Sequence, residues 1–164
     1  MFETCLEKQK KVLDFFTGCT TAEEKYQKII DLGKTQPHLD LKYKTEEHLV
    51  QGCQSRMYLH AEMRGGFVFF EAEADALISA GLGCLLLYVY SGETPEVILK
   101  CPPHHIDELG IRQTLTPGRA NGLASVYLRI KQEALKFYMA QNKSGGDKIR
   151  LANQDADAVA SEAH

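Results

Sequence analysis

Two apolar segments joined by a glycine pair constrain the fold of this chain more than any other feature. Apolar and polar side chains alternate over residues 55–63, which predicts a β-strand with one buried face. Gly65 and Gly66 follow, and residues 67–72 form a second apolar segment, so the two segments predict an antiparallel hairpin. Because a hairpin alone is only marginally stable in water, helices or a third strand must cover it. Residues 49–51 are the candidate third strand.

Most of the remaining sequence predicts helices. Residues 2–16 carry apolar side chains at helical spacing, and Thr21 with Glu24 forms a capping box for a second helix that ends near Gly33. Residues 34–48 show no period and predict a loop. Further helices are expected over 75–90 with Asp75 as the cap, after Thr94, over 104–109, and from Thr116 onward. We therefore expect an α+β fold, in which a small antiparallel sheet of about three strands is packed with helices.

The domain organisation follows from length and composition. A chain of 164 residues fits one domain, which we place at residues 1–142. From residue 143 large apolar side chains become rare, and small and polar residues prevail. This composition predicts a disordered C-terminal tail over residues 143–164.

Charge and hydropathy argue against two classes of partner. The formal net charge is −3 and no basic stripe forms, so nucleic acid is not an expected partner. The longest apolar run, residues 77–90, is too short to cross a membrane and predicts a core segment instead. The first residues lack the basic-then-apolar order of a signal peptide, which predicts a cytoplasmic protein.

The cysteines include one that stands apart. Five are present, no two of them spaced as C-x-x-C, so free thiols are expected rather than a disulfide framework or a local zinc site. Cys53 follows Gly52 where a loop meets the first strand, and Gln54 and Ser55 come directly after it. A thiol in that place is a candidate nucleophile. The alternative is a small buried apolar residue, in a binding module whose cysteine is inert.

Several short motifs recur in the order and spacing of a known family. The most specific are Val50-Gln-Gly-Cys-Gln-Ser55 and Leu115-Thr-Pro-Gly-Arg-Ala-Asn-Gly-Leu123. Tyr90-Ser-Gly-Glu-Thr-Pro95 adds to them. Through these motifs, whose order holds from about residue 23 to about residue 136, the chain resembles the SufE-type sulfur acceptors of iron–sulfur cluster assembly. It departs from the family at Gly118, where serine is frequent.

The resemblance implies a fold, a function and partners. The fold would be a compact α+β domain similar to the SufE and IscU-type fold, with Cys53 at the tip of an exposed loop. Cys53 would receive sulfur as a persulfide from a SufS-like cysteine desulfurase, which this protein would activate, and pass it to a SufBCD-like iron–sulfur scaffold. No cofactor or metal of its own is implied, because the pyridoxal phosphate belongs to the desulfurase. No independent turnover of a small molecule is expected, and a homodimer stays open.

The chemistry needs few residues beside the acceptor thiol. A thiolate attacks the outer sulfur of a donor persulfide and the donor thiolate leaves, so no acid–base pair is required. We expect Gly52, Gln54 and Ser55 to shape the loop and to contact the partner. Arg119 is expected in the first turn of the last helix, where a cation opposes the helix dipole. A contact with the loop or with a partner is therefore predicted for it.

A second hypothesis is a scaffold similar to IscU that binds an iron–sulfur cluster or zinc. Its ligands would be Cys53, Cys84, Cys101 and His104 or His105. Against it, IscU-type scaffolds carry a Gly-Cys-Gly step where this chain reads Gly81-Leu82-Gly83, which removes one ligand. The adjacent histidines also point apart, and a solvated helix start is the expected place for them.

Overall fold

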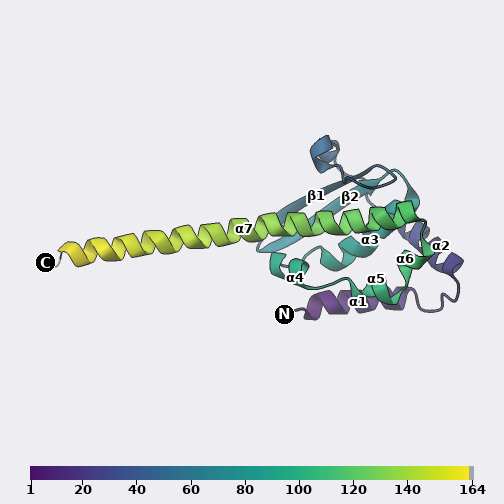
Figure 1. The fold of residues 1–164 in the computed structure, drawn as a ribbon, viewed down its shortest axis with the longest axis horizontal. Coiled ribbons are helices and arrows are strands. Elements are labelled where there is room, and N and C mark those ends of the chain that lie inside the picture. Colours follow the sequence, from purple (N-terminus) through teal and green to yellow (C-terminus); the bar gives the residue numbers. More distant parts are fainter. Residues whose placement is uncertain (163–164) are drawn as a thin grey trace.

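The computed structural model describes the backbone of residues 1–162 and the side chains of residues 1–143; residues 163–164 lie outside it (Figure 1). In chain order the elements are α1 (Glu3–Phe15), α2 (Ala22–Gly33), η1 (Leu41–Tyr43), η2 (Glu46–His48), β1 (Met57–Arg64), β2 (Phe67–Ala74), α3 (Leu77–Tyr90), α4 (Pro95–Lys100), α5 (His104–Glu108), α6 (Ile111–Thr114) and α7 (Pro117–Glu162). The two 3-10 turns η1 and η2 and the short helix α6 are the elements that the sequence pattern did not predict.

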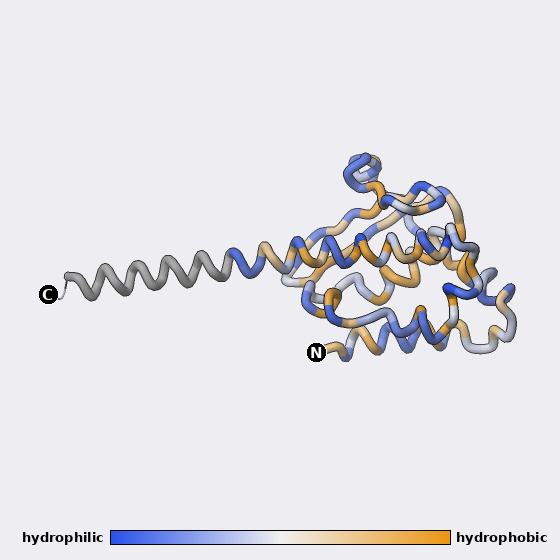
Figure 2. Tube along the Cα trace, viewed as in Figure 1, coloured by the Kyte–Doolittle hydropathy of each residue, from blue (hydrophilic) through white to orange (hydrophobic). Residues whose placement is uncertain are grey.

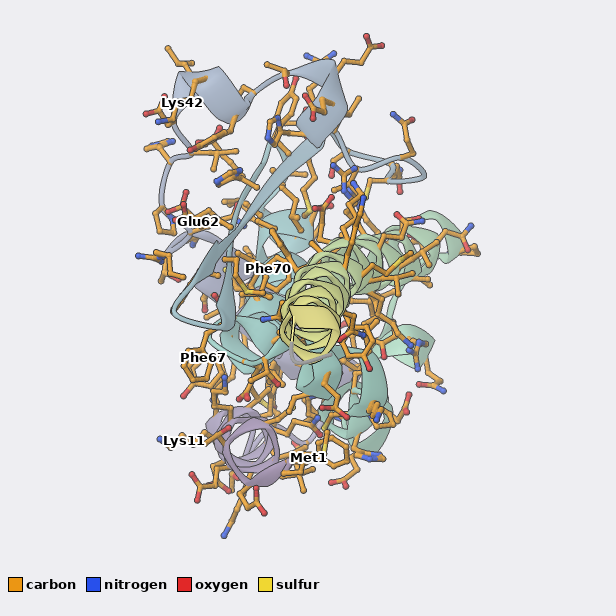
Figure 3. The ribbon with its side chains drawn as sticks, turned by 90° about the vertical axis from the view of Figure 1, so that its left-hand side faces the viewer. Met1, Lys11, Lys42, Glu62, Phe67 and Phe70 are labelled. Atoms are coloured by element: carbon orange, nitrogen blue, oxygen red, sulfur yellow. The ribbon has the colours of Figure 1, made fainter. Side chains whose placement is uncertain are left out.

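The predicted hairpin is confirmed. β1 and β2 pair antiparallel from Met57 opposite Ala74 to Arg64 opposite Phe67. Phe70 on β2 is buried in the fold, whereas Phe67 at the turn is exposed (Figure 3). The α+β class is therefore correct, with helices packed on a two-stranded sheet.

The predicted third strand is reduced to a single bridge. Leu49 pairs with Tyr58 in isolation, and the Val50 amide donates to the Met57 carbonyl oxygen at 2.9 Å. The pairing ends there because the chain turns away at Gly52, whose φ of +87° is incompatible with an extended strand. The expectation of about three strands was wrong in this detail.

Helix α3 forms the centre of the core, between the hairpin and α1 (Figure 1), and it packs against α1, α2, α7 and β2. Its approach to α2 is unusually close. A Cβ atom at Gly81 would lie 1.9 Å from the Ile29 carbonyl oxygen, so only glycine fits at that crossing. Figure 2 shows the apolar residues of α3 gathered in the middle of the fold.

The start of α3 differs from the prediction. Asp75 was expected to cap this helix, but the N-cap residue is Ala76, which makes no side-chain capping bond. The Asp75 carboxylate instead accepts a hydrogen bond from the Arg56 amide at 3.0 Å, and the Asp75 amide donates to the Arg56 carbonyl oxygen at 3.0 Å. Asp75 therefore fixes the end of the Cys53 loop rather than the helix.

The first half of α7 closes the core through Leu123, Val126, Ile130 and Ala134, which are buried against α3 and α4. The helix extends to Glu162, whereas the sequence predicted a disordered tail over residues 143–164. The side chains of residues 144–164 lie outside the described residues, so the boundary at residue 142 and the order of the tail stay predictions. Among the described residues, no helix has both the length and the apolarity needed to cross a membrane.

Candidate functional site

The loop that carries Cys53 is anchored at both ends and turned in the middle by Gly52. The bridge between Leu49 and Tyr58 fixes its start, and the two hydrogen bonds between Arg56 and Asp75 fix its end. Between these anchors Gly52 has a φ of +87°, a conformation that L side chains rarely adopt. Gly52 therefore turns the chain immediately before the cysteine.

The loop lies on a face of small residues at the start of α7. Gly118, Gly122 and Ser125 fall at helical spacing along this face. A Cβ atom at Gly118 would lie 2.7 Å from Gln54 Oε1, and one at Gly52 would lie 2.5 Å from Ser125 Oγ. The loop thus packs on the helix along most of its length. The contact can be this close because Gly52 on the loop and Gly118 on α7 have no side chains.

The Cys53 thiol points into this contact. Cys53 Sγ lies 3.7 Å from the Gly122 carbonyl oxygen, and the residue is half-buried. Beside it is a cavity of about 10 Å³, which is at the lower limit of the volume that can hold one water molecule. Gly52 and Gln54 are exposed, whereas Cys53 is half-buried with its thiol turned inward, although the resemblance to SufE proteins implied that Cys53 lies at an exposed tip.

Two opposing effects act on the acidity of the thiol. Burial raises the pKa of Cys53 because it disfavours the charged thiolate, and the nearby Arg119 guanidinium lowers it. Burial is the larger effect. Arg119 is the charged group that favours the thiolate, and it lines the same cavity as Cys53.

Arg119 reaches the site through a residue that the sequence did not single out. Its Nη1 atom donates to Ser79 Oγ on α3 at 2.8 Å, and Ser55 Oγ lies 2.6 Å from the same oxygen. Ser79 and Arg119 both line the cavity beside Cys53. Ser79 lies in an apolar helix far from either motif in the sequence, so no local pattern marks it.

The other cysteines lie elsewhere. Cys5 and Cys101 are both buried, with their sulfur atoms 3.2 Å apart, and burial raises the pKa of Cys5 to about 12. Cys84 is half-buried and lines a separate cavity of about 600 Å³ between α1, α3, β2 and residues 35–39. That cavity is the larger of the two, but its lining does not include Cys53.

The alternative metal site is not assembled. Cys53 lies against α7, Cys101 against Cys5, and Cys84 in the separate cavity. Within residues 1–143, no three His, Cys, Asp or Glu side chains are grouped so that they could hold a metal ion. The scaffold hypothesis therefore loses its proposed ligand set.

The histidine of that hypothesis was also misplaced. His105 is fully buried rather than solvated, its Nε2 donates to the Leu85 carbonyl oxygen at 3.1 Å, and burial lowers its pKa to about 4. His104 is exposed, as expected. Sequence analysis missed the burial of His105 because α5 is too short for a periodic pattern to show which side faces the core.

Comparison with known proteins identifies a matching family model and several similar proteins. Residues 10–134 match the family model SufE, described as the Fe-S metabolism associated domain. An uncharacterized SufE-like protein of Rhizobium meliloti is 34% identical over 129 residues, which cover 76% of this chain and 92% of that protein. An uncharacterized SufE-like protein of Synechocystis is 29% identical over 136 residues, or 83% of this chain and 86% of that protein.

Two further relatives extend the comparison. The SufE-like protein 1, chloroplastic/mitochondrial, of Arabidopsis thaliana is 32% identical over 131 residues; these make up 78% of this chain but only 35% of that protein. The solution structure of a hypothetical protein from Thermus thermophilus superposes with a TM-score of 0.64 at 27% identity, covering 79% of this chain and 94% of that one. The shared architecture thus includes most of the chain.

Proposed function

Since this chain belongs to the SufE family, whose domain is associated with Fe-S metabolism, we propose that it is a sulfur acceptor that carries sulfur as a persulfide on Cys53. The observation that supports this most directly is the position of that thiol. It lies in a loop turned by Gly52, beside a cation at Arg119 that favours the thiolate, and on a helix face that leaves it half-buried. A structural cysteine needs none of these features.

The transfer step is an exchange between sulfur atoms. The Cys53 thiolate attacks the outer sulfur of a donor persulfide. A new S–S bond forms to Cys53 Sγ, the S–S bond of the donor breaks, and its electron pair leaves on the donor thiolate. No net oxidation or reduction occurs, so the chain needs no redox group and no acid–base pair for this step.

The loop must move for a donor to approach. The cavity of about 10 Å³ beside the thiol has no room for a second side chain. The two anchors at Leu49 and Arg56 lie at the ends of the loop, whereas residues 51–54 are held mainly by packing on α7. We propose that residues 51–54 lift from α7 when a donor docks, and that the half-buried state shelters the bound sulfur afterwards.

The partners in this proposal come from the family. The donor is a cysteine desulfurase, whose pyridoxal phosphate performs the cleavage of the carbon–sulfur bond, and which this protein stimulates by removing its product sulfur. The receiver is an iron–sulfur cluster scaffold. Five free thiols suit a reducing compartment, for which we propose the cytoplasm.

The test is a sulfur-transfer assay in which every cysteine is monitored. The protein is incubated with a pyridoxal phosphate-dependent cysteine desulfurase and free cysteine, and each cysteine peptide is examined by mass spectrometry. We expect the mass of one added sulfur atom on the Cys53 peptide, and no sulfur acceptance by a Cys53→Ser variant with an unchanged circular dichroism spectrum. If that variant stimulated sulfide release as well as the wild type, the proposed function would be wrong.

A further inference from the structure

One buried hydroxyl group connects the Cys53 loop to the start of α7. Ser79 Oγ lies 2.6 Å from Ser55 Oγ and 2.8 Å from Nη1 of Arg119. Ser55 follows the acceptor cysteine by two residues, and Arg119 is the cation that lowers the pKa of the Cys53 thiol. The loop and the cation thus share a single partner atom.

Ser79 is suited to fix other groups because it is itself fixed. It is only 8% exposed and lies on α3, which packs against four other elements of the core. Arg119, by contrast, is a long and half-exposed side chain that would sample many rotamers without a partner. A side chain that is bonded to a rigid, buried element keeps its position better than one that is held only by a loop or by another surface side chain.

The chemical nature of this partner also matters. Among the described side chains, no carboxylate forms an ion pair with Arg119, and Ser79 is the hydrogen-bond partner of its guanidinium. A neutral hydroxyl orients a guanidinium without cancelling its charge, whereas a carboxylate would neutralise much of its field. The positive charge therefore remains effective at Cys53, the other titratable side chain that lines the cavity between the loop, β1, α3 and α7.

We propose that Ser79 is a positioning residue, which holds the uncompensated guanidinium of Arg119 beside Cys53 and tethers the cysteine loop through Ser55. The purpose of this arrangement rests on the proposed function, but the arrangement itself is tested on the free protein. Its two contacts have separate consequences. The contact with Arg119 sets the acidity of the thiol, and the contact with Ser55 sets how often the loop exposes it.

The experiment measures the rate of Cys53 alkylation by iodoacetamide against pH, with the Cys53 peptide quantified by mass spectrometry. The midpoint of the profile reports the thiol pKa, and the plateau at high pH reports access. We expect Ser79→Ala to raise the midpoint by roughly half a pH unit to one unit above that of Ser55→Ala, which also frees the loop, as loss of a nearby cation should. The plateau rate should also rise, because the loop loses its tether.

Two matched variants separate the contacts. Ser55→Ala keeps the bond between Arg119 and Ser79 but frees the loop, so it should raise the plateau and should not raise the midpoint, because a less buried thiol is more acidic. It is therefore the reference with which the midpoint of Ser79→Ala is compared. Arg119→Ala should raise the midpoint. Adding Ser79→Ala to it should cause no further upward shift, because both changes remove the same effect, that of the Arg119 charge on the Cys53 thiol. Ser79→Thr keeps the hydroxyl and should restore the wild-type midpoint.

Two results would overturn the proposal: a midpoint in Ser79→Ala no higher than that in Ser55→Ala, or a full additional upward shift when Ser79→Ala is combined with Arg119→Ala. Neither result depends on a desulfurase. A failure of Cys53 to accept sulfur in the transfer assay would therefore refute the proposed function while leaving the positioning role of Ser79 to be judged on the alkylation profile alone.

Discussion

The Cys53 thiol lies 3.7 Å from the carbonyl oxygen of Gly122, a residue 69 positions later in the chain. A Cβ atom at Gly122 would lie 3.8 Å from that sulfur, at van der Waals contact, so the thiol rests directly on the helix backbone. The first turns of α7 therefore form the surface on which the Cys53 side chain packs. The motif around Cys53 and the motif around Gly122 form one structural unit, although each is local in the sequence.

The first prediction concerns the turn before the cysteine. Replacing Gly52 by alanine places a Cβ atom at positive φ and 2.5 Å from Ser125 Oγ. Positive φ alone costs an L-residue roughly 1–2 kcal/mol, and the clash should displace the loop as well. We expect Gly52→Ala to lower the free energy of unfolding by about 2 kcal/mol or more and to impair sulfur acceptance.

A matched control is available for this change. Gly18 also has positive φ, at +93°, but a Cβ atom there would meet nothing within 4 Å. Gly18→Ala should therefore show the conformational cost alone, with normal sulfur acceptance. Removing the clashing hydroxyl by Ser125→Ala should partly rescue Gly52→Ala. Equal losses in the two glycine variants, measured by urea denaturation, would contradict the role given to the helix contact.

The second prediction is that the other four thiols are dispensable for transfer. A variant with alanine at positions 5, 19, 84 and 101 should still take up sulfur on Cys53. Some loss of stability is expected from the buried pair Cys5 and Cys101, on the order of 1 kcal/mol for each small buried change. The measurement is peptide mass analysis after incubation with desulfurase and cysteine. Loss of transfer in a folded variant would show that one of the four resolves or relays the sulfur.

The third prediction concerns acid stability. Burial lowers the pKa of His105 to about 4, whereas an unfolded histidine titrates near 6.5. Between these two pH values the unfolded state binds a proton that the folded state does not, so the free energy of unfolding falls as the pH falls from about 6.5 towards 4. The total effect should be on the order of 3 kcal/mol, since each pKa unit corresponds to about 1.4 kcal/mol.

Urea denaturation at pH 7 and pH 5 tests this, because carboxylates remain mostly ionised over that window. His105→Gln should be less stable than wild type at pH 7, as it disturbs the bond to the Leu85 carbonyl oxygen, but should lose less stability on going to pH 5. Substitution of the exposed His104 by glutamine should leave the pH dependence as in wild type. The same pH dependence in His105→Gln and wild type would contradict a buried neutral imidazole.

The fourth prediction concerns the C-terminal segment. Its composition, poor in large apolar residues, predicts that residues 143–164 do not contribute to the packed domain. Truncation after Asn142 should therefore leave the melting temperature and sulfur acceptance unchanged. Amide hydrogen exchange provides an independent check, with fast exchange expected after residue 145. A lower melting temperature, or protection from exchange, would show that the segment docks on the domain.

The elements that depend on local interactions could be predicted from the amino-acid sequence. Alternation of apolar residues and a glycine pair predicted the β1–β2 hairpin, and Thr21 with Glu24 predicted the start of α2, where the Glu24 amide donates to Thr21 Oγ1 at 3.1 Å. The glycine before Cys53 likewise made this cysteine a candidate nucleophile, whereas its role as sulfur acceptor was implied by the resemblance to SufE proteins. Periodicity and helix capping depend on residues a few positions apart, so they can be recognised in a single sequence.

Contacts between residues far apart in the chain could not be predicted in this way, because they depend on the packing of the whole fold. The burial of the Cys53 thiol, the link from Ser79 to Arg119, and the buried position of His105 each depend on how separate elements pack. Asp75 shows the same limit, because it had the character of a helix cap but bonds to the loop end at Arg56 instead. The physical reason is that a residue's type fixes which bonds it can form, while packing of the whole core fixes which partner lies within reach.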